Sequence, residues 1–331
     1  MNLLGHITNN TTENCFFSQV GQEVNRDMLS EMKAFSPGLL VAFSIVNLFL
    51  GVASFAGNAL VILTIIFFSE LRQITTNIGL ASLATVSLFH GTILNSFLFA
   101  VGVNTLLDGC PIFRSTRFAV FYLSHTFIFN SLFNLCIVTT ERYIAVAFPL
   151  RYLTILPKER MVKVVRTAWL ASFLVSVPNG IDKPASQTTG KLLWFLTISL
   201  TLAFTSYCNI KMFVISRRHK RQVKTQLEAV QQIAVKQQSF RGAGTVFCVL
   251  VTVVTCYVPA ILVRLGITST TTPTDKNKLD TVALIQPWTS TFYVMYSALS
   301  PFVYFFRCKR LRQYSRKLFT KALRFIRASF L

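Results

Sequence analysis

The sequence predicts an all-α membrane protein, a seven-transmembrane helix bundle followed by a C-terminal amphipathic helix on the membrane surface. Three observations indicate this fold. The 331-residue chain is 52% hydrophobic and only 14% charged, whereas soluble domains carry about 25% charged residues. Seven long stretches contain no charged residue, and basic residues gather in alternate connections between them.

The seven uncharged stretches have lengths suited to membrane-spanning helices. A helix needs about 20 residues to cross a hydrocarbon core about 30 Å thick. The fourth stretch is short, so we expect it to include residues 162–166, with Lys163 and Arg166 extending to the interface. The runs lack the alternation of a membrane β-barrel. The stretches are residues 34–69, 73–107, 118–140, 167–181, 192–210, 242–263 and 281–306.

Basic residues predict the orientation. Most of the 33 lysines and arginines lie in the odd-numbered connections and the C-terminal tail. The positive-inside rule assigns that side to the cytoplasm, so we expect a multi-pass plasma-membrane protein with an extracellular N-terminus. The same bias explains the net charge of +21. A basic stripe beside a membrane attracts anionic lipid, and we favour this interpretation over binding of nucleic acid.

Three segments follow from the spans. We expect an extracellular tail over residues 1–36, without a cleavable signal peptide, a transmembrane domain over 37–306, and a cytoplasmic amphipathic helix and tail over 307–331. We expect residues 217–241 to form helical extensions of the fifth and sixth spans. We expect the second outer connection over about residues 179–190. The last segment repeats apolar residues at helical spacing among basic ones, namely Leu311, Tyr314, Leu318, Ala322 and Phe325.

The predicted outer side carries two further features. Asn9 and Asn10 begin overlapping glycosylation sequons. Cys15 and Cys110 are the cysteines expected on the oxidising side. They either form a disulfide that ties the tail over the bundle or remain two free thiols.

Short motifs occur in order along the spans. They are Gly57-Asn58, Ser82-Leu83-Ala84, Glu141-Arg142-Tyr143, Pro149-Leu150-Arg151-Tyr152, Trp169, Tyr207, Cys256-Tyr257-Val258-Pro259 and Ser300-Pro301-Phe302-Val303-Tyr304. Together they resemble the rhodopsin-like (class A) G-protein-coupled receptors over residues 37–325. The resemblance implies an extracellular ligand, a heterotrimeric G-protein partner and outward movement of the sixth helix. It implies an inner switch formed by Glu141, Arg142, Tyr143, Tyr207, Tyr257, Pro259, Ser300, Pro301 and Tyr304.

Departures from the family pattern indicate a divergent member. Ser87 stands at the position of the second-helix aspartate, which removes the acidic centre of the family's sodium site. Ser300 replaces the usual asparagine and Tyr257 the sixth-helix tryptophan. Residues 236–241 lack the acidic residue that in many relatives pairs with the third-helix arginine at rest.

The charge of Arg142 ends a helix that is uncharged from residue 118 to residue 140. Burial of this charge costs several kcal/mol unless it is paired, and Glu141 is the adjacent partner. The alternative is an arginine that extends to the interface and only anchors the helix. Tyr207 and Tyr304 are hydroxyl partners for Arg142 once the inner helix ends separate, with Pro259 and Pro301 as flex points.

The outer half of the bundle contains no acidic residue. Ser124 occupies the position where aminergic members carry a carboxylate, so we expect a non-aminergic ligand. Arg117, Phe121, Ser124 and His125 lie near one another along the third span, and Arg264 follows the sixth. The two arginines either meet lipid phosphate or bind an anionic small molecule or lipid as ligand.

No catalytic or metal-binding pattern occurs. We find no His/Cys cluster with metal spacing, phosphate loop or nucleophile elbow, so the sequence predicts no enzyme and no cofactor. The alternative function is a seven-helix transporter or channel. Such a protein should carry charged or broken helices at the bilayer midplane, and this pattern is absent from the sequence.

Overall fold

The computed structural model describes residues 35–107, 114–181, 184–227 and 276–329, together with residues 256, 258 and 262. Every element within these residues is helical, as the sequence predicts. In chain order they are α3 (Pro37–Phe67), α4 (Ser69–Arg72), α5 (Thr75–Leu106), α6 (Arg114–Ala147), α7 (Tyr152–Ile155), α8 (Lys158–Ser176), the 3-10 helix η1 (Val177–Gly180), α9 (Pro184–Leu227), α11 (Lys276–Arg307) and α12 (Lys309–Ser329).

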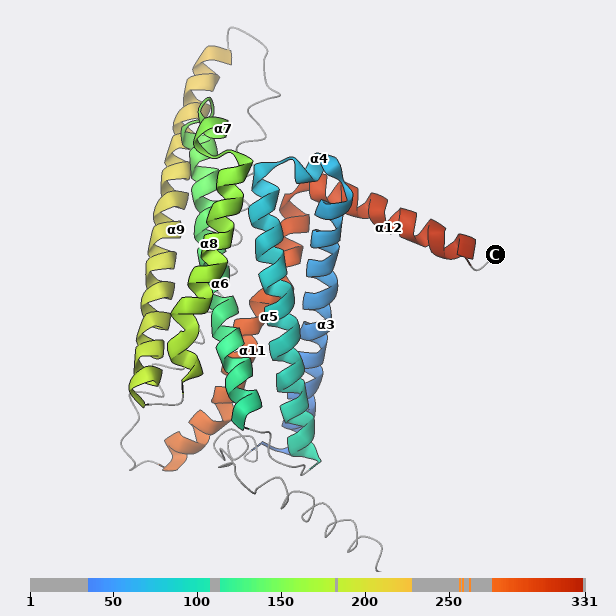
Figure 1. Ribbon diagram of the computed structural model, residues 1–331, viewed down its shortest axis with the longest axis vertical. Helices are drawn as coiled ribbons and strands as arrows, with labels where there is room; N and C mark the ends of the chain where they lie inside the picture. Colours follow the sequence, from blue (N-terminus) through green and yellow to red (C-terminus); the bar gives the residue numbers. More distant parts are fainter. Residues whose placement is uncertain are drawn as a thin grey trace, which may run out of the picture.

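The long helices stand side by side in an upright bundle (Figure 1). Helix α3 packs along α5, α5 along α6, and α6 against both α8 and α9, while α11 closes against α3 and α5. The short helices α4 and α7 lie at one end of the bundle, together with the start of α12 (Figure 1). These are elements that the charge pattern assigns to the cytoplasmic side, and we call this the inner end.

Five of the described helices are long and apolar enough to cross a bilayer. They cover Pro37–Phe67, Thr75–Leu106, Ala119–Ala147, Lys158–Asn179 and Thr188–Arg218. Helix α11 contains the predicted seventh span, and it includes Pro287 as well as Pro301. The predicted sixth span, residues 242–263, lies outside the described residues except for Cys256, Val258 and Leu262.

Local sequence explains where several helices begin. Pro37 occupies the first turn of α3, and the preceding Ser36 side chain accepts a hydrogen bond from the Leu39 backbone N–H. Helix α8 follows Pro157 and includes residues 158–166, so the short fourth stretch reaches spanning length with Lys163 and Arg166 exposed. Because α9 begins at Pro184, the second outer connection is shorter than the predicted 179–190.

Several hydroxyl side chains inside the bundle bond to their own helices. Ser44 donates to the Leu40 carbonyl at 2.8 Å, Thr64 to the Leu60 carbonyl at 2.7 Å, and Thr105 to the Val101 carbonyl at 2.8 Å. Each bond spans four residues back along the helix. This pattern lets small polar residues occupy an apolar bundle without an unsatisfied donor.

Helix α12 leaves the bundle sideways from the inner end (Figure 1). A single residue, Cys308, separates it from α11, and the backbone N–H of Cys308 donates to the Tyr304 carbonyl at 2.8 Å. This element is the predicted amphipathic C-terminal helix. The predicted extension of the fifth span is also present, since α9 continues to Leu227.

Candidate functional site at the inner end of the bundle

The inner end of α6 carries a charged pair. The Arg142 Nε lies 2.8 Å from the Glu141 Oε2. The Glu141 side chain is only 1% exposed, whereas Arg142 is 23% exposed. A carboxylate this deeply buried requires compensation for its lost hydration, and the guanidinium supplies part of it.

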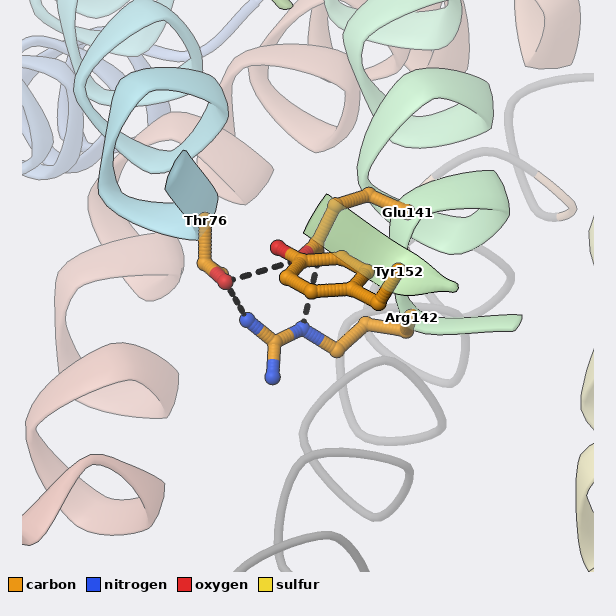
Figure 2. A network of polar contacts seen from close by, with 4 residues as sticks. All are labelled: Thr76, Glu141, Arg142 and Tyr152. Carbon is orange, nitrogen blue, oxygen red and sulfur yellow. Dashed lines mark hydrogen bonds and ion pairs between the residues drawn. The ribbon is translucent and has the colours of Figure 1, made fainter. Parts of the chain in front are cut away.

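Two hydroxyl groups complete the network (Figure 2). The Thr76 hydroxyl, from the first turn of α5, donates to the Glu141 Oε1 at 2.8 Å and accepts a hydrogen bond from the Arg142 Nη2. The Tyr152 hydroxyl, from α7, donates to the same Glu141 oxygen. We call these four residues the inner clamp, because they join three successive elements, α5, α6 and α7.

The electrostatics of the inner clamp favour a neutral tyrosine. Partial burial, together with the nearby Glu141 carboxylate, raises the pKa of Tyr152 to about 12. The phenol therefore remains protonated and can donate its hydrogen bond throughout the physiological pH range.

Two tyrosines predicted for the inner switch, Tyr207 and Tyr304, do not contact Arg142. Tyr207 is 58% exposed on α9, and the Lys211 Nζ sits 5.5 Å from the centroid of its ring. Tyr304 is 1% exposed and belongs to the central apolar cluster, which also contains Tyr296. In this arrangement Arg142 contacts Thr76 and Glu141 instead of either tyrosine.

A neutral polar layer occupies the middle of the bundle. The Asn58 side-chain amide donates to the Ser297 carbonyl at 2.9 Å, and its oxygen accepts from the Ser300 hydroxyl at 3.3 Å. The Ser54 hydroxyl donates to the Ser87 carbonyl at 3.0 Å, while the His90 Nδ1 lies 3.2 Å from the Ser297 hydroxyl. Helices α3, α5 and α11 thus meet through hydroxyl, amide and imidazole groups.

Close helix packing joins two of the sequence motifs. A Cβ atom added to Gly57 would lie 2.8 Å from the Cγ and 3.0 Å from the Cβ of Pro301. The absent side chain of Gly57 therefore lets α3 approach the proline ring of α11. This contact packs α3 directly against the α11 segment that carries Ser300, Pro301 and Tyr304.

In the outer half, Phe121 and His125 lie one turn apart on α6. The His125 Nδ1 is 2.7 Å from the Phe121 carbonyl, and the Phe121 ring meets Phe97 of α5 edge-on at 6.3 Å. Ser124 is 4% exposed, and its hydroxyl has no hydrogen-bond partner within the described residues. Arg117 precedes Phe121 by four residues on α6, nearer the outer end of the helix.

Several predicted residues lie outside the described residues. They are Asn9, Asn10, Cys15, Cys110, Tyr257, Pro259 and Arg264. Their predicted roles remain predictions. Within the described part of the chain, no three His, Cys, Asp or Glu side chains come together as metal ligands.

Sequence reasoning missed two members of the inner clamp. Thr76 lies 65 residues before Glu141, and no motif contains it, so only the packing of α5 against α6 reveals the contact. Tyr152 was recognised as part of the Pro-Leu-Arg-Tyr run, but without a role. Its position eleven residues after Glu141, beyond the end of α6, is a signal that could have suggested the contact.

Comparison with known proteins agrees with this architecture. A family model described as 7 transmembrane receptor (rhodopsin family) matches residues 57–304. The chain belongs to this family. The receptor is therefore a multi-pass membrane protein with a seven-transmembrane helix bundle. The matched region extends from the Gly57-Asn58 pair to Tyr304, and includes the inner clamp.

Individual relatives resemble only part of the receptor. It is 30% identical to the alpha-2B adrenergic receptor of Didelphis virginiana over 197 residues, 55% of this chain and 50% of that protein. It is 33% identical to trace amine-associated receptor 7c of Rattus norvegicus over 144 residues, which are 43% of this chain and 38% of that protein. It is 36% identical to dopamine receptor 1 of Drosophila melanogaster over 156 residues, which are 45% of this chain and 29% of that protein. The receptor thus spans half or less of the length of these relatives.

Proposed function

We propose that this receptor transmits an extracellular ligand signal to a heterotrimeric G protein by outward movement of the sixth helix. The inner clamp is the observation that carries the proposal. Arg142 is the only lysine or arginine between residues 118 and 150. Its guanidinium is held by Thr76 and Glu141 instead of extending freely to the interface. A charge held by so few contacts can exchange partners when neighbouring helices move.

The proposed topology and segments support this function. An extracellular tail over residues 1–36, a transmembrane domain over 37–306 and a cytoplasmic segment over 307–331 place the inner clamp on the cytoplasmic side of the plasma membrane. The basic residues of the inner connections support this orientation. In the proposed active arrangement Arg142 leaves the clamp and meets Tyr207 and Tyr304, with Pro259 and Pro301 as flex points.

We propose a ligand that is not a cationic amine. The relatives reported above are named for adrenergic, trace-amine and dopamine ligands, and a buried ammonium group needs a carboxylate partner. In the third span the only acidic residue is Glu141, at the inner end. The sequence predicts the cations Arg117 and Arg264 near the Ser124 hydroxyl, and these groups would fit a carboxylate, phosphate or sulfate on a small molecule or lipid.

The decisive experiment neutralises Arg142. We expect Arg142→Ala to abolish G-protein activation while leaving surface expression largely intact, because the charge that exchanges partners is gone. Signalling is measured with sensors of G-protein dissociation for several Gα classes, in the wild-type chain and in a Tyr152→Phe background, in which we expect higher ligand-free output. Arg166→Ala, which removes an exposed cation from α8, is the matched control. Full signalling by a well-expressed Arg142→Ala variant would contradict the proposal.

A further inference from the structure

His90 joins three helices in the middle of the bundle. It belongs to α5 and is 2% exposed. Its Nδ1 lies 3.2 Å from the Ser297 hydroxyl oxygen of α11, so these two groups share a hydrogen bond. Its ring also lies near Phe127 of α6, with the ring centroids 6.3 Å apart. Water cannot readily replace a hydrogen bond buried this deeply, so its loss leaves a polar atom unpaired.

The helices next to His90 are in close contact. A Cβ atom added to Gly91 of α5 would lie 2.5 Å from the Cβ of Ser54 in α3 and 3.0 Å from the Cβ of Ser297 in α11. The Ser54 hydroxyl donates to the Ser87 carbonyl at 3.0 Å, which fixes α3 against α5 at the same level. Side chains of α3 and α11 therefore fill the space beside Gly91.

A sodium ion at this level, which the family resemblance implies, lacks a negative ligand. Burial of a cation without a partner of opposite charge is strongly unfavourable. Helices α3 and α5 contain no acidic residue, because Ser87 stands at the aspartate position. The acidic residues of α6 and α11 are Glu141 and Asp280, each near one end of its helix. Within the described residues, the neutral polar layer therefore offers a cation no carboxylate.

The oxygens of the neutral polar layer already accept hydrogen bonds. The Asn58 amide nitrogen donates to the Ser54 carbonyl at 2.8 Å and to the Ser297 carbonyl at 2.9 Å, while its oxygen accepts from the Ser300 hydroxyl at 3.3 Å. The Ser87 hydroxyl has no hydrogen-bond partner within the described residues. One neutral oxygen does not compensate a buried cation for its lost hydration. The groups present do not fit the ion.

We propose that the His90–Ser297 hydrogen bond takes the place of a bound cation and holds α5 against α11 in the resting receptor. His90 is then a positioning residue for the inner switch, because the Ser297 carbonyl accepts from the Ser300 hydroxyl at 3.2 Å, one turn further along α11. Loss of the bond frees this segment of α11 and raises ligand-free output. This effect on signalling rests on the proposed function, whereas the effects on stability do not.

The first test varies sodium and uses the wild-type chain. Thermal denaturation of the purified full-length receptor in detergent micelles is measured in sodium chloride and in N-methyl-D-glucamine chloride at the same ionic strength, which keeps general screening constant. We expect the same Tm in both salts. A Tm that rises specifically with sodium would overturn the proposal, because it would show that the ion binds the folded receptor.

The second test is a double-mutant cycle on the hydrogen bond. His90→Leu and Ser297→Ala should each lower the Tm by about 2 °C or more, and the double variant should lose little more than the larger single loss. His90→Gln, which retains a polar group on a side chain of similar length, should recover most of the loss. Additive losses for the pair, or a His90→Gln variant no more stable than His90→Leu, would overturn the assignment.

Ser44→Ala is the matched control for the cycle. Ser44 is 4% exposed in α3, and its hydroxyl donates to the Leu40 carbonyl of its own helix at 2.8 Å. Its effect on the Tm should add to that of His90→Leu, because the two residues share no hydrogen bond. Coupling as strong as that between His90 and Ser297 would show a general loosening of the bundle and would contradict the proposal.

The signalling test compares the same variants at matched surface expression. His90→Leu should raise ligand-free output about threefold or more, and Ser44→Ala should leave it unchanged. If G-protein sensors respond to Tyr152→Phe but not to His90→Leu, the hydrogen bond does not hold the resting state and the proposal is wrong. If the sensors respond to neither variant while the coupling in Tm is present, the result counts against the proposed function instead.

Discussion

Loss of the Tyr152 hydroxyl should raise ligand-free signalling. Tyr152→Phe removes one of the two hydroxyl donors to the Glu141 Oε1 and leaves the ring in place. A hydrogen bond to a charged group contributes about 1.5–3 kcal/mol. Because Tyr152 is only partly buried, water can replace some of this bond, and we expect the resting arrangement to lose about 1 kcal/mol. This shift corresponds to about a fivefold increase in the ratio of active to resting receptor.

Thr76→Ala should have a larger effect, because the Thr76 hydroxyl contacts both charged side chains. The double variant should fall short of additivity, since both hydroxyls bind the same Glu141 oxygen. The assay is ligand-free activation of G-protein dissociation sensors at matched surface expression. Tyr122→Phe is the control, because it removes a tyrosine hydrogen bond to the Phe173 carbonyl, which lies outside the inner clamp. No increase in either variant, or an equal increase in the control, would refute the reasoning.

The Tyr152 hydroxyl should remain protonated at physiological pH. The pKa of Tyr152 is raised to about 12, above its ordinary value near 10. The neutral hydroxyl therefore contributes fully below about pH 10 and is lost as pH rises toward about 12. We expect the ratio of Tyr152→Phe to wild-type signalling to be the same at about pH 6 and about pH 8.5. A ratio that changes more than about twofold over this interval would contradict the assigned cause.

Three further predictions concern other parts of the receptor. Gly57→Ala should destabilise the receptor by about 1–3 kcal/mol, because the new Cβ would lie 2.8 Å from the Cγ of Pro301 in α11. Thermal denaturation should show a lower Tm for this variant than for the control Gly38→Ala, whose new Cβ has nothing within 4 Å. Arg264→Ala should lower the potency of an anionic agonist about tenfold or more without changing ligand-free output; an agonist whose potency ignores both Arg264 and Arg117 would refute the ligand proposal. Cys15 and Cys110 should appear as one cross-linked peptide in a non-reducing map, and two free thiols would reject the bridge.

The bundle was largely predictable because bilayer crossing imposes a strong constraint on sequence. Long uncharged stretches determine which residues become spanning helices. Helices α6, α9 and α11 contain the stretches assigned to them, and α3, α5 and α8 cover most of theirs. Helix ends were less predictable. Helix α9 begins at Pro184, before the uncharged stretch that starts at residue 192, because a helix can continue through polar residues beyond the hydrocarbon core.

Contacts between helices were much less predictable. The pairing of Glu141 with Arg142 could be proposed from their adjacency in the sequence. The contact with Thr76 depends on how α5 and α6 are aligned along the bundle, which no local pattern specifies. The same limit explains Tyr207, whose motif gives no information about which side of α9 it faces in this arrangement.

The neutral polar layer has a consequence for how the receptor senses the membrane's electric field. The movement of one elementary charge across the bilayer changes the free energy by about 2.3 kcal/mol per 100 mV. The middle layer joins α3, α5 and α11 through Asn58, Ser54, Ser87, Ser297 and Ser300, with Ser87 at the usual aspartate position. Rearrangement of these uncharged groups displaces almost no charge through the field. The middle layer should therefore contribute little to any change in the balance between resting and active receptor when a cell depolarises.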